Sequence, residues 1–332
     1  MSEKKLILQS SPHLREQDSV RKVMMTVVLA LAPAMAASVW FFGWRALLVQ
    51  VVAVVACLAF EALGLLLLKR PMKEHITDGS AVVTGLLLAM NLPSSIPIWM
   101  TVVGSAVAIL VAKIPYGGIG NNPFNPALVG RVFMFVAFPT AMTSWPKPIE
   151  GALDLFVNAE TGATPLGMLK YVQKGTEGFS MSGAMPGSTA DMLLGNVGGC
   201  IGEISAAALL LGGLFMLWRK VITWHIPVAF IGSVFVFSGI FYLVDPAHYA
   251  NPLFHVLSGG VMLGAIFMAT DMVTSPVTTK GMIIFGLGCG IITCLIRLLA
   301  SFPEGVSFAI LIMNGLTPLI DRYIKPAPFA KA

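Results

Sequence analysis

The chain has 332 residues, of which 56% are hydrophobic and 11% charged, and its mean hydropathy is +0.84. Soluble domains carry about 25% charged residues, so this composition excludes an ordinary soluble protein and predicts an integral membrane protein. The net charge of +5 does not indicate nucleic-acid binding, because the basic residues are dispersed near the ends of apolar runs and form no stripe with aromatic residues.

Long apolar runs predict an all-α membrane protein, since the strands of a membrane β-barrel would be about half the length of a spanning helix and would alternate in polarity. Hydropathy predicts about ten transmembrane helices. Their ranges are 23–43, 46–68, 78–92, 97–112, 127–142, 197–217, 224–244, 255–270, 281–299 and 305–320. No cleavable apolar core precedes the first range, so we expect no signal peptide.

The distribution of Lys and Arg predicts the orientation. Most of them fall at span ends that share a side with residues 1–22, which places both termini in the cytoplasm and the long polar segment outside it. The predicted organisation is a cytoplasmic N-terminal segment (1–22), a first membrane repeat (23–142), an extracytoplasmic loop (143–196), a second membrane repeat (197–321) and a cytoplasmic tail (322–332).

The polar segment separates five predicted spans from five, so related halves would have opposite orientations, as in an inverted repeat. Asp78–Pro97 aligns weakly with Leu257–Pro276, and Gly85 pairs with Gly264 in that alignment. Both segments are short and bounded by Gly, Ser or Pro, and paired broken helices of this kind indicate a binding site at the repeat interface. Two ordinary short helices in a tilted neighbourhood are the alternative.

One octapeptide in the polar segment, Asn158–Pro165, reads Asn-Ala-Glu-Thr-Gly-Ala-Thr-Pro. Its order predicts that Thr164 is a helix N-cap and that Pro165 is the first helical residue. A phosphate ester on Thr164 would then face the free N–H groups and the positive end of the helix dipole. The nearby Ser-Gly-Ala-Met-Pro sequence has Met185 where the hydroxyl would be, so only Thr164 could be an acceptor. A cap with no further role is the alternative.

The turn Gly117–Pro126 precedes the fifth predicted span and contains three Gly and three Asn residues. Glycine allows close backbone approach, and Asn supplies paired donors and acceptors suited to a flavin edge or another planar polar ligand. The candidate ligand residues are Gly118, Asn121, Asn122 and Asn125. A purely structural turn could use the same residue types.

Glu61 and Glu203 lie inside predicted spans, where a charged side chain is costly and usually functional. Each is a candidate for ion coupling, and each could instead be a snorkelling or helix-paired residue. Cysteine and histidine spacings predict no metal or iron–sulfur site, and no hydrolase triad, Walker or Rossmann pattern occurs in a suitable context. We therefore expect no catalytic residue that turns over a substrate on this chain alone.

Four motifs in this order resemble one family: Asp78-Gly79-Ser80 with Thr84-Gly85, the turn from Gly117 to Ala127, Thr161-Gly162-Ala163-Thr164-Pro165, and Met272-Val273-Thr274-Ser275-Pro276. The chain resembles the D subunit of the Rnf ion-translocating electron transport complex. The homologous B subunit of the sodium-translocating NADH:quinone reductase belongs to the same family. The resemblance covers nearly the whole chain.

The resemblance implies a flavoprotein of the bacterial inner membrane with a urea-transporter-like fold. It implies FMN joined through its phosphate to Thr164, within the motif formed with Thr161, Gly162, Ala163 and Pro165, and a second, noncovalent riboflavin-type flavin in the membrane part. The implied partners are a flavin transferase and the sister subunits of a ferredoxin- and NAD-coupled complex, including an extracytoplasmic FMN subunit and iron–sulfur subunits. The family pattern usually has Asp where this chain has Asn158.

Two other functions suit the same sequence. A solute channel or transporter of urea-transporter-like fold would also use an inverted repeat with paired short helices, and would carry no covalent flavin. A scaffold subunit without a cofactor is the third possibility. A flavin that stays on the denatured chain would exclude both.

Overall fold

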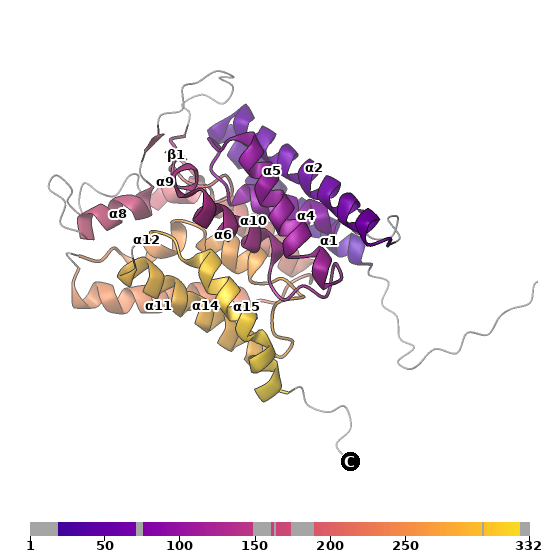
Figure 1. Ribbon diagram of the computed structural model, residues 1–332. Helices are drawn as coiled ribbons and strands as arrows, with labels where there is room; N and C mark the ends of the chain where they lie inside the picture. The colour runs from indigo at the N-terminus through magenta and orange to yellow at the C-terminus, as the bar shows by residue number, and fades with distance from the viewer. Residues whose placement is uncertain are drawn as a thin grey trace, which may run out of the picture.

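The computed structural model describes residues 19–70, 76–148, 161–162, 164–173, 189–246, 248–300 and 302–325. Ala163, Asn158 and Met185 lie outside these residues. The described chain is almost entirely helical (Figure 1). The longer helices are α1 (Val20–Phe42), α2 (Trp44–Leu67), α4 (Ser80–Met90), α5 (Ile98–Ala106), α6 (Pro126–Ala137), α10 (Ala206–Trp218), α11 (His225–Val244), α14 (Thr279–Leu299) and α15 (Val306–Tyr323).

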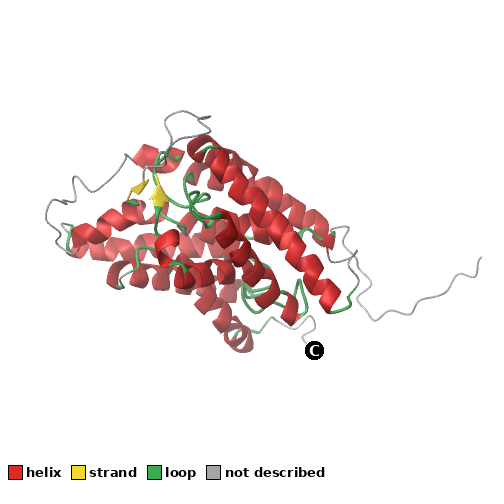
Figure 2. Ribbon diagram, turned by 45° about the horizontal axis from the view of Figure 1, so that its top comes forward, coloured by secondary structure: helices red, strands yellow, loops and turns green. Residues whose placement is uncertain are grey.

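Shorter elements connect these helices. They are the π-helical turns η1 (Val107–Val111) and η3 (Gly264–Met268), the 3-10 turn η2 (Ile114–Tyr116), and the helices α7 (Pro139–Met142), α8 (Pro165–Gln173), α9 (Thr189–Leu194), α12 (Pro252–Leu257) and α13 (Val261–Leu263). One antiparallel pair, β1 (Trp145–Pro146) with β2 (Thr161–Gly162), is the sheet among the described residues, drawn yellow in Figure 2.

Five helical segments of the described chain are long and apolar enough to cross a membrane: Val20–Phe42, Trp44–Leu67, Ile98–Tyr116, His225–Val244 and Thr279–Leu299. Outward-facing leucines on these and neighbouring helices, such as Leu67 and Leu211, are more than half exposed. A surface of this kind suits lipid rather than water. The prediction of an all-α membrane protein is therefore confirmed.

Three predicted spans differ from the observed helices. The range 197–217 is helical only from Ala206, because the preceding residues form a turn instead. In that turn the N–H groups of Ile201 and Gly202 donate to carbonyls at the end of α4, on Leu92 and Met90, at 3.0 and 2.8 Å. These bonds satisfy backbone groups that would otherwise lack partners in a membrane.

The other two differences have local causes. The range 127–142 is interrupted at Phe138, since the following Pro139 disfavours helical geometry in the residue before it. The range 255–270 is interrupted after Leu257, where Gly259 has a φ of +64° that a residue with a side chain would rarely adopt. The second interruption lies next to a polar cluster described below, since a Cβ on Gly259 would lie 2.7 Å from Arg297 and from Glu304.

Close helix crossings hold the membrane part together. A Cβ built on Gly85 of α4 would lie 2.8 Å from the Cα of Val54 in α2, and one built on Gly212 of α10 would lie 2.1 Å from the carbonyl oxygen of Ala30 in α1. Only glycine permits these backbones to approach so closely, which is a common means of packing helices in lipid.

The two halves of the chain form one body. In the first half α2 packs against α4 and α5, and in the second half α11 packs against α12 and α14. Helix α1 packs against α10, and α6 packs against α15, so both pairs join the halves (Figure 1). One hydrophobic core includes fully buried residues of both, such as Leu88 and Phe285. The start of α1 and the end of α15 lie at the opposite end of the molecule from β1 and α8.

Candidate functional site

Thr164 caps helix α8, as its sequence context predicts. The helix begins at Pro165, and the N–H of Gly167 donates to the Thr164 hydroxyl at 3.0 Å. The N–H of Met168 donates to the Thr164 carbonyl at 2.8 Å, which closes the first turn. The hydroxyl is therefore held at the N-terminus of a helix, where the dipole favours a negative group.

Packing fixes α8 on the membrane part. Leu166 and Leu169 are buried in a small apolar cluster with Met192 and Phe254, and the ammonium of Lys170 donates to the carbonyl of Ala300 at 2.7 Å. These contacts come from α9, α12 and the end of α14. The packing of its helix thus helps to set the position of Thr164.

Thr161 and Gly162 form β2, in which Gly162 lies opposite Trp145 and Thr161 opposite Pro146. A Cβ on Gly162 would lie 3.2 Å from the Cε of Lys147, so the strand passes close to this basic side chain. The backbone before the acceptor hydroxyl is consequently anchored as well as the helix after it.

A small cavity of about 40 Å³ lies beside Thr164. Its lining includes Trp145, Gly199, Glu203, Ser258 and Glu304. A cavity needs about 10–15 Å³ of such volume to hold one water, so this one takes waters and excludes a flavin ring. A ring tethered to Thr164 would have to lie outside it.

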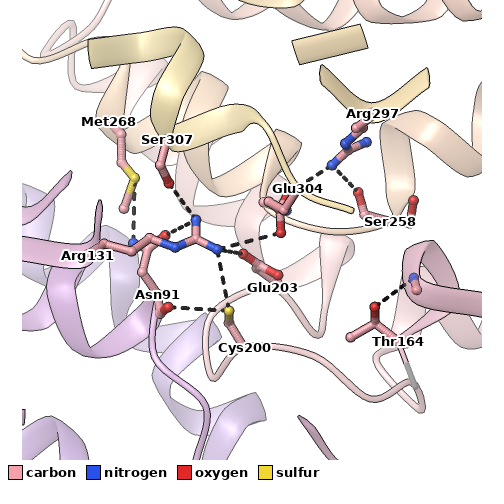
Figure 3. Close-up of polar contacts among 12 residues, drawn as sticks. Asn91, Arg131, Thr164, Cys200, Glu203, Ser258, Met268, Arg297, Glu304 and Ser307 are labelled. Carbon is pink, nitrogen blue, oxygen red and sulfur yellow. Dashed lines mark hydrogen bonds and ion pairs between the residues drawn. The ribbon is translucent and has the colours of Figure 1, made fainter. Parts of the chain in front are cut away.

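Two residues that line this cavity, Glu203 and Glu304, belong to a buried cluster of four charges (Figure 3), which we call the Arg–Glu cluster: Arg131, Glu203, Arg297 and Glu304. The guanidinium of Arg131, on α6, lies 3.3 Å from a carboxylate oxygen of Glu203 and 3.6 Å from one of Glu304. Its other terminal nitrogen donates to Asn91 at 2.8 Å and to Ser307 at 2.7 Å. Arg131 therefore connects the first half of the chain with the second.

Arg297 completes the cluster from the last turn of α14. It lies 3.0 Å from Glu304 and donates to the carbonyls of His255 at 2.6 Å and Ser258 at 3.1 Å. Glu304 also accepts from the N–H of Gly260 at 2.8 Å. Two cations and two carboxylates balance, so each buried charge has an opposite partner, as a low-dielectric environment requires.

A much larger cavity, of about 440 Å³, lies near the start of α1 and away from Thr164. Mostly apolar side chains of α1, α4, α10 and η3 line it. The polar side chains among them are Ser19, Ser80, Thr84, Lys113, Asn122, Asn125, Thr270 and Asp271. Cavities of about 300–1,000 Å³ with apolar walls and a few placed polar groups hold cofactor-sized molecules. We call this the large cavity.

A second buried ion pair lies at the wall of the large cavity. The ammonium of Lys113 contacts the carboxylate of Glu61 and donates to the hydroxyl of Ser80 at 2.6 Å. That hydroxyl donates to Asp78 at 2.6 Å. Lys113 and Glu61 are 2% exposed each.

The Asn-rich turn divides into residues that reach the large cavity and residues that do not. Asn122 and Asn125 line it, whereas Asn121 is exposed and Gly118 is not part of the lining. The Asn125 side chain caps α6, accepting from Ala127 at 3.1 Å and donating to the carbonyl of Met268 at 3.3 Å. Both polar atoms of Asn125 are thereby engaged in the fold. Asn122 donates through its Nδ2 to the carbonyl of Phe124 at 3.1 Å, and its Oδ1 accepts no hydrogen bond from the described residues, so Asn122 is the better ligand candidate.

Both intramembrane acids singled out from the sequence, Glu61 and Glu203, are buried and ion-paired. Their partners were missed. The partner of Glu61 is Lys113, just after the predicted span 97–112, and the partner of Glu203 is Arg131. Arg131, an isolated charge inside an apolar run, carried the one signal that could have indicated a buried cluster.

Comparison with known proteins gives a consistent result. A family model described as NQR2, RnfD, RnfE matches residues 7–330. A protein of Clostridium ljungdahlii named as the D subunit of a proton-translocating ferredoxin:NAD(+) oxidoreductase complex is 45% identical over 97% of this chain and 95% of its own length. An Acetobacterium woodii protein named as the same subunit of a Na(+)-translocating complex is also 45% identical, over 98% of this chain and 95% of its own. A Salmonella newport protein named as the D subunit of an ion-translocating oxidoreductase complex is 39% identical, over 96% and 97%.

Proposed function

The chain belongs to the NQR2, RnfD, RnfE family, and from that premise we propose that it is a membrane flavoprotein subunit of an Rnf-type complex. In this role it passes electrons between FMN bound covalently at Thr164 and a second flavin in the large cavity. The complex would couple ferredoxin and NAD to ion translocation, as the names of its relatives state for them. Sister subunits, including an extracytoplasmic FMN subunit and iron–sulfur subunits, would supply and remove electrons.

The observation that carries this proposal is the fixed hydroxyl of Thr164. It lies at the N-terminus of α8, and that helix is docked on the membrane part by its own apolar face. A phosphodiester on this oxygen would meet free N–H groups and the positive end of the dipole. The ring, which the 40 Å³ cavity excludes, would lie where a partner protein could reach it.

Mass spectrometry of the purified chain tests this assignment. We expect the peptide containing Thr164 to carry the mass of FMN joined with loss of water, and the denatured band to fluoresce. A full-length chain with an unmodified Thr164 peptide, isolated from cells that make the complete complex, would refute the covalent flavin. It would favour a channel or transporter instead.

The large cavity supports a second, noncovalent flavin. Its apolar walls suit the faces of an isoalloxazine ring, and Asn122, Ser80 and Lys113 offer hydrogen-bonding groups to a polar ring edge. Flavin bound there would supply one- and two-electron transfer. The chain's own residues would hold the ring and exclude water from it.

Replacing Asn122 with leucine should deplete the acid-extractable flavin and leave the FMN on Thr164 in place. The loss of directional bonds costs about 1–3 kcal/mol, which is about a fivefold to hundredfold loss of affinity at about 1.4 kcal/mol per decade. The matched control is Asn121→Leu in the same turn, because Asn121 is exposed and outside the cavity lining. Equal depletion in both variants, or none in either, would remove Asn122 from the pocket.

We also propose that the fold is a ten-span, five-plus-five inverted repeat of the urea-transporter type in the inner membrane, with cytoplasmic termini. Three observations support it. The second and fourth predicted spans of each half pack together, as α2 with α5 and α11 with α14. The short segments α4 in the first half, and α13 with η3 in the second, come between these two helices in the chain. The described chain starts and ends at the end of the molecule opposite β1 and α8 (Figure 1), and α8 is the helix that follows Thr164.

Ion coupling is proposed at Glu61 and Glu203. Each is a buried carboxylate held by a buried cation, and the two pairs lie beside the two proposed flavin positions. The relatives of equal identity are named for different ions, so the choice of ion depends on features finer than family membership.

A further inference from the structure

The side chain of Lys113 makes two polar contacts and also lines the large cavity. It pairs with Glu61, it donates to Ser80, and it lines the large cavity. An ammonium has three N–H donors, and two of them have acceptors in these side chains. The cation is therefore placed to interact with a carboxylate on one side and with the contents of the cavity on the other.

A purely structural explanation of this pair is weak. Removing two charges from water costs several kcal/mol per ion, and a buried ion pair is often no more stable than apolar residues of similar volume. The pair joins α2 to the turn between η1 and η2, and these segments already pack together where a Cβ on Gly64 of α2 would lie 3.1 Å from the side chain of Ile114, so they do not need an ion pair to hold them together. Because Lys113 lies at the wall of the large cavity, its positive charge is placed to act on a ligand there.

The other charged group that lines the cavity is Asp271. Its carboxylate accepts from the N–H of Val273 at 3.4 Å and from the hydroxyl of Thr274 at 3.2 Å, both in its own turn. Asp78 is engaged by Ser80 in the same way. Of the described charged groups facing the cavity, Lys113 is the cation, and its nearest carboxylate is Glu61.

We propose that Lys113 is a positioning residue shared between Glu61 and an electron-rich ligand in the large cavity, so that negative charge on the ligand and negative charge on Glu61 compete for one ammonium. The inference rests on the proposed second flavin. Two electrons and one proton convert an oxidised flavin to an anionic reduced form, with the electrons supplied by the complex or, in a titration, by dithionite. Lys113 would compensate that negative charge and would then hold Glu61 less strongly.

This arrangement predicts opposite effects from the two members of the pair. Lys113→Met removes the cation and should make the bound flavin harder to reduce. Glu61→Gln removes the competing carboxylate, leaves the ammonium to the ligand, and should make the flavin easier to reduce. If the pair only supported the shape of the cavity, Lys113→Met and Glu61→Gln would change the reduction potential in the same direction, or would lower the flavin content without changing the potential.

The experiment uses the full-length chain in lipid nanodiscs with Thr164→Val in every sample, so that added riboflavin is the flavin observed. Binding is followed by fluorescence, and the midpoint potential by titration with dithionite. We expect Lys113→Met to lower the ratio of reduced to oxidised riboflavin at fixed potential at least tenfold, which is about 30 mV for a two-electron couple. Glu61→Gln should raise that ratio, and should change it little when Lys113→Met is also present.

The matched control is Lys280→Met, which makes the same change of charge at an exposed position outside the cavity. It should leave the potential unchanged. If Lys113→Met does not fold, the isosteric variant Glu61→Gln still tests the proposal. A midpoint potential of bound riboflavin that does not rise in Glu61→Gln overturns it. If riboflavin binds but its midpoint potential is the same with and without Lys113→Met, the proposal that Lys113 is shared is wrong, while the second flavin site stands. Failure of the Thr164→Val chain to bind riboflavin overturns the second flavin site and the shared cation together.

Discussion

Thr164→Val should yield a folded chain with no covalent flavin. Valine has nearly the shape of threonine and lacks the oxygen through which the phosphate would be joined. The substitution also removes the acceptor for the Gly167 N–H, which costs about 1 kcal/mol as for other lost N-caps. Since Leu166 and Leu169 hold α8 by packing, the helix should stay docked. The expected loss of FMN is therefore complete, while the loss of stability is small.

Two further variants separate the acceptor from the cap. Thr164→Ser keeps both the oxygen and the cap and should retain flavin on the denatured band. Thr161→Val changes the other hydroxyl of the motif, in β2, and should leave some flavin. Fluorescence of the denatured chain and the mass of the Thr164 peptide are the measurements. Flavin phosphate on a Thr164→Val chain would show that another residue is the acceptor.

The local features of this site could be read from the sequence because neighbouring residues determine them. Thr164 followed by Pro165 is sufficient to start a helix, and α8 begins where that order places it. The glycines that break the segment after Leu257 are likewise local signals. Fold class followed from composition, since apolar runs of spanning length leave few alternatives.

Tertiary partners could not be read in this way. Lys113 and Glu61 are separated by 52 positions, and Arg131 and Glu203 by 72. Hydropathy also extended the sixth predicted span across residues 197–205, because it measures polarity and not backbone geometry. Those residues are mostly buried, yet the N–H groups of Ile201 and Gly202 are bonded to the end of α4. Asn121 and Asn122 are adjacent residues of the same type, so the sequence could not show that Asn122 lines the large cavity while Asn121 is exposed.

Arg131→Met should be the most destabilising single change in the Arg–Glu cluster. Arg131 is 5% exposed and contacts Asn91, Ser307, Glu203 and Glu304. Methionine fills part of the volume but leaves Glu203 buried without this cation. Removing one partner of a buried ion pair typically costs about 3–5 kcal/mol. We expect a lower unfolding temperature in detergent and a smaller yield of intact chain.

Adding Glu203→Gln to Arg131→Met should recover part of that loss, because a neutral amide does not need the missing cation. The recovery is read as the coupling energy of a double-mutant cycle, for which contacting residues typically give about 0.5–3 kcal/mol. Equal instability of the single and double variants would mean that Arg131 acts through Asn91 and Ser307 and not through Glu203.

The same variants separate a structural role of Glu203 from a role in ion coupling. Glu203→Gln alone leaves Arg131 with Glu304 at 3.6 Å, and Arg297 also balances Glu304 at 3.0 Å, so the fold should tolerate it better than the loss of Arg131. If Glu203 must change its charge as an ion passes, this variant should fold, keep its covalent FMN and lose ion transport by the assembled complex in vesicles. If the carboxylate only neutralises Arg131, transport by the folded complex should persist. Flavin content is the internal reference in both cases, because Thr164 is positioned by α8 and not by the Arg–Glu cluster.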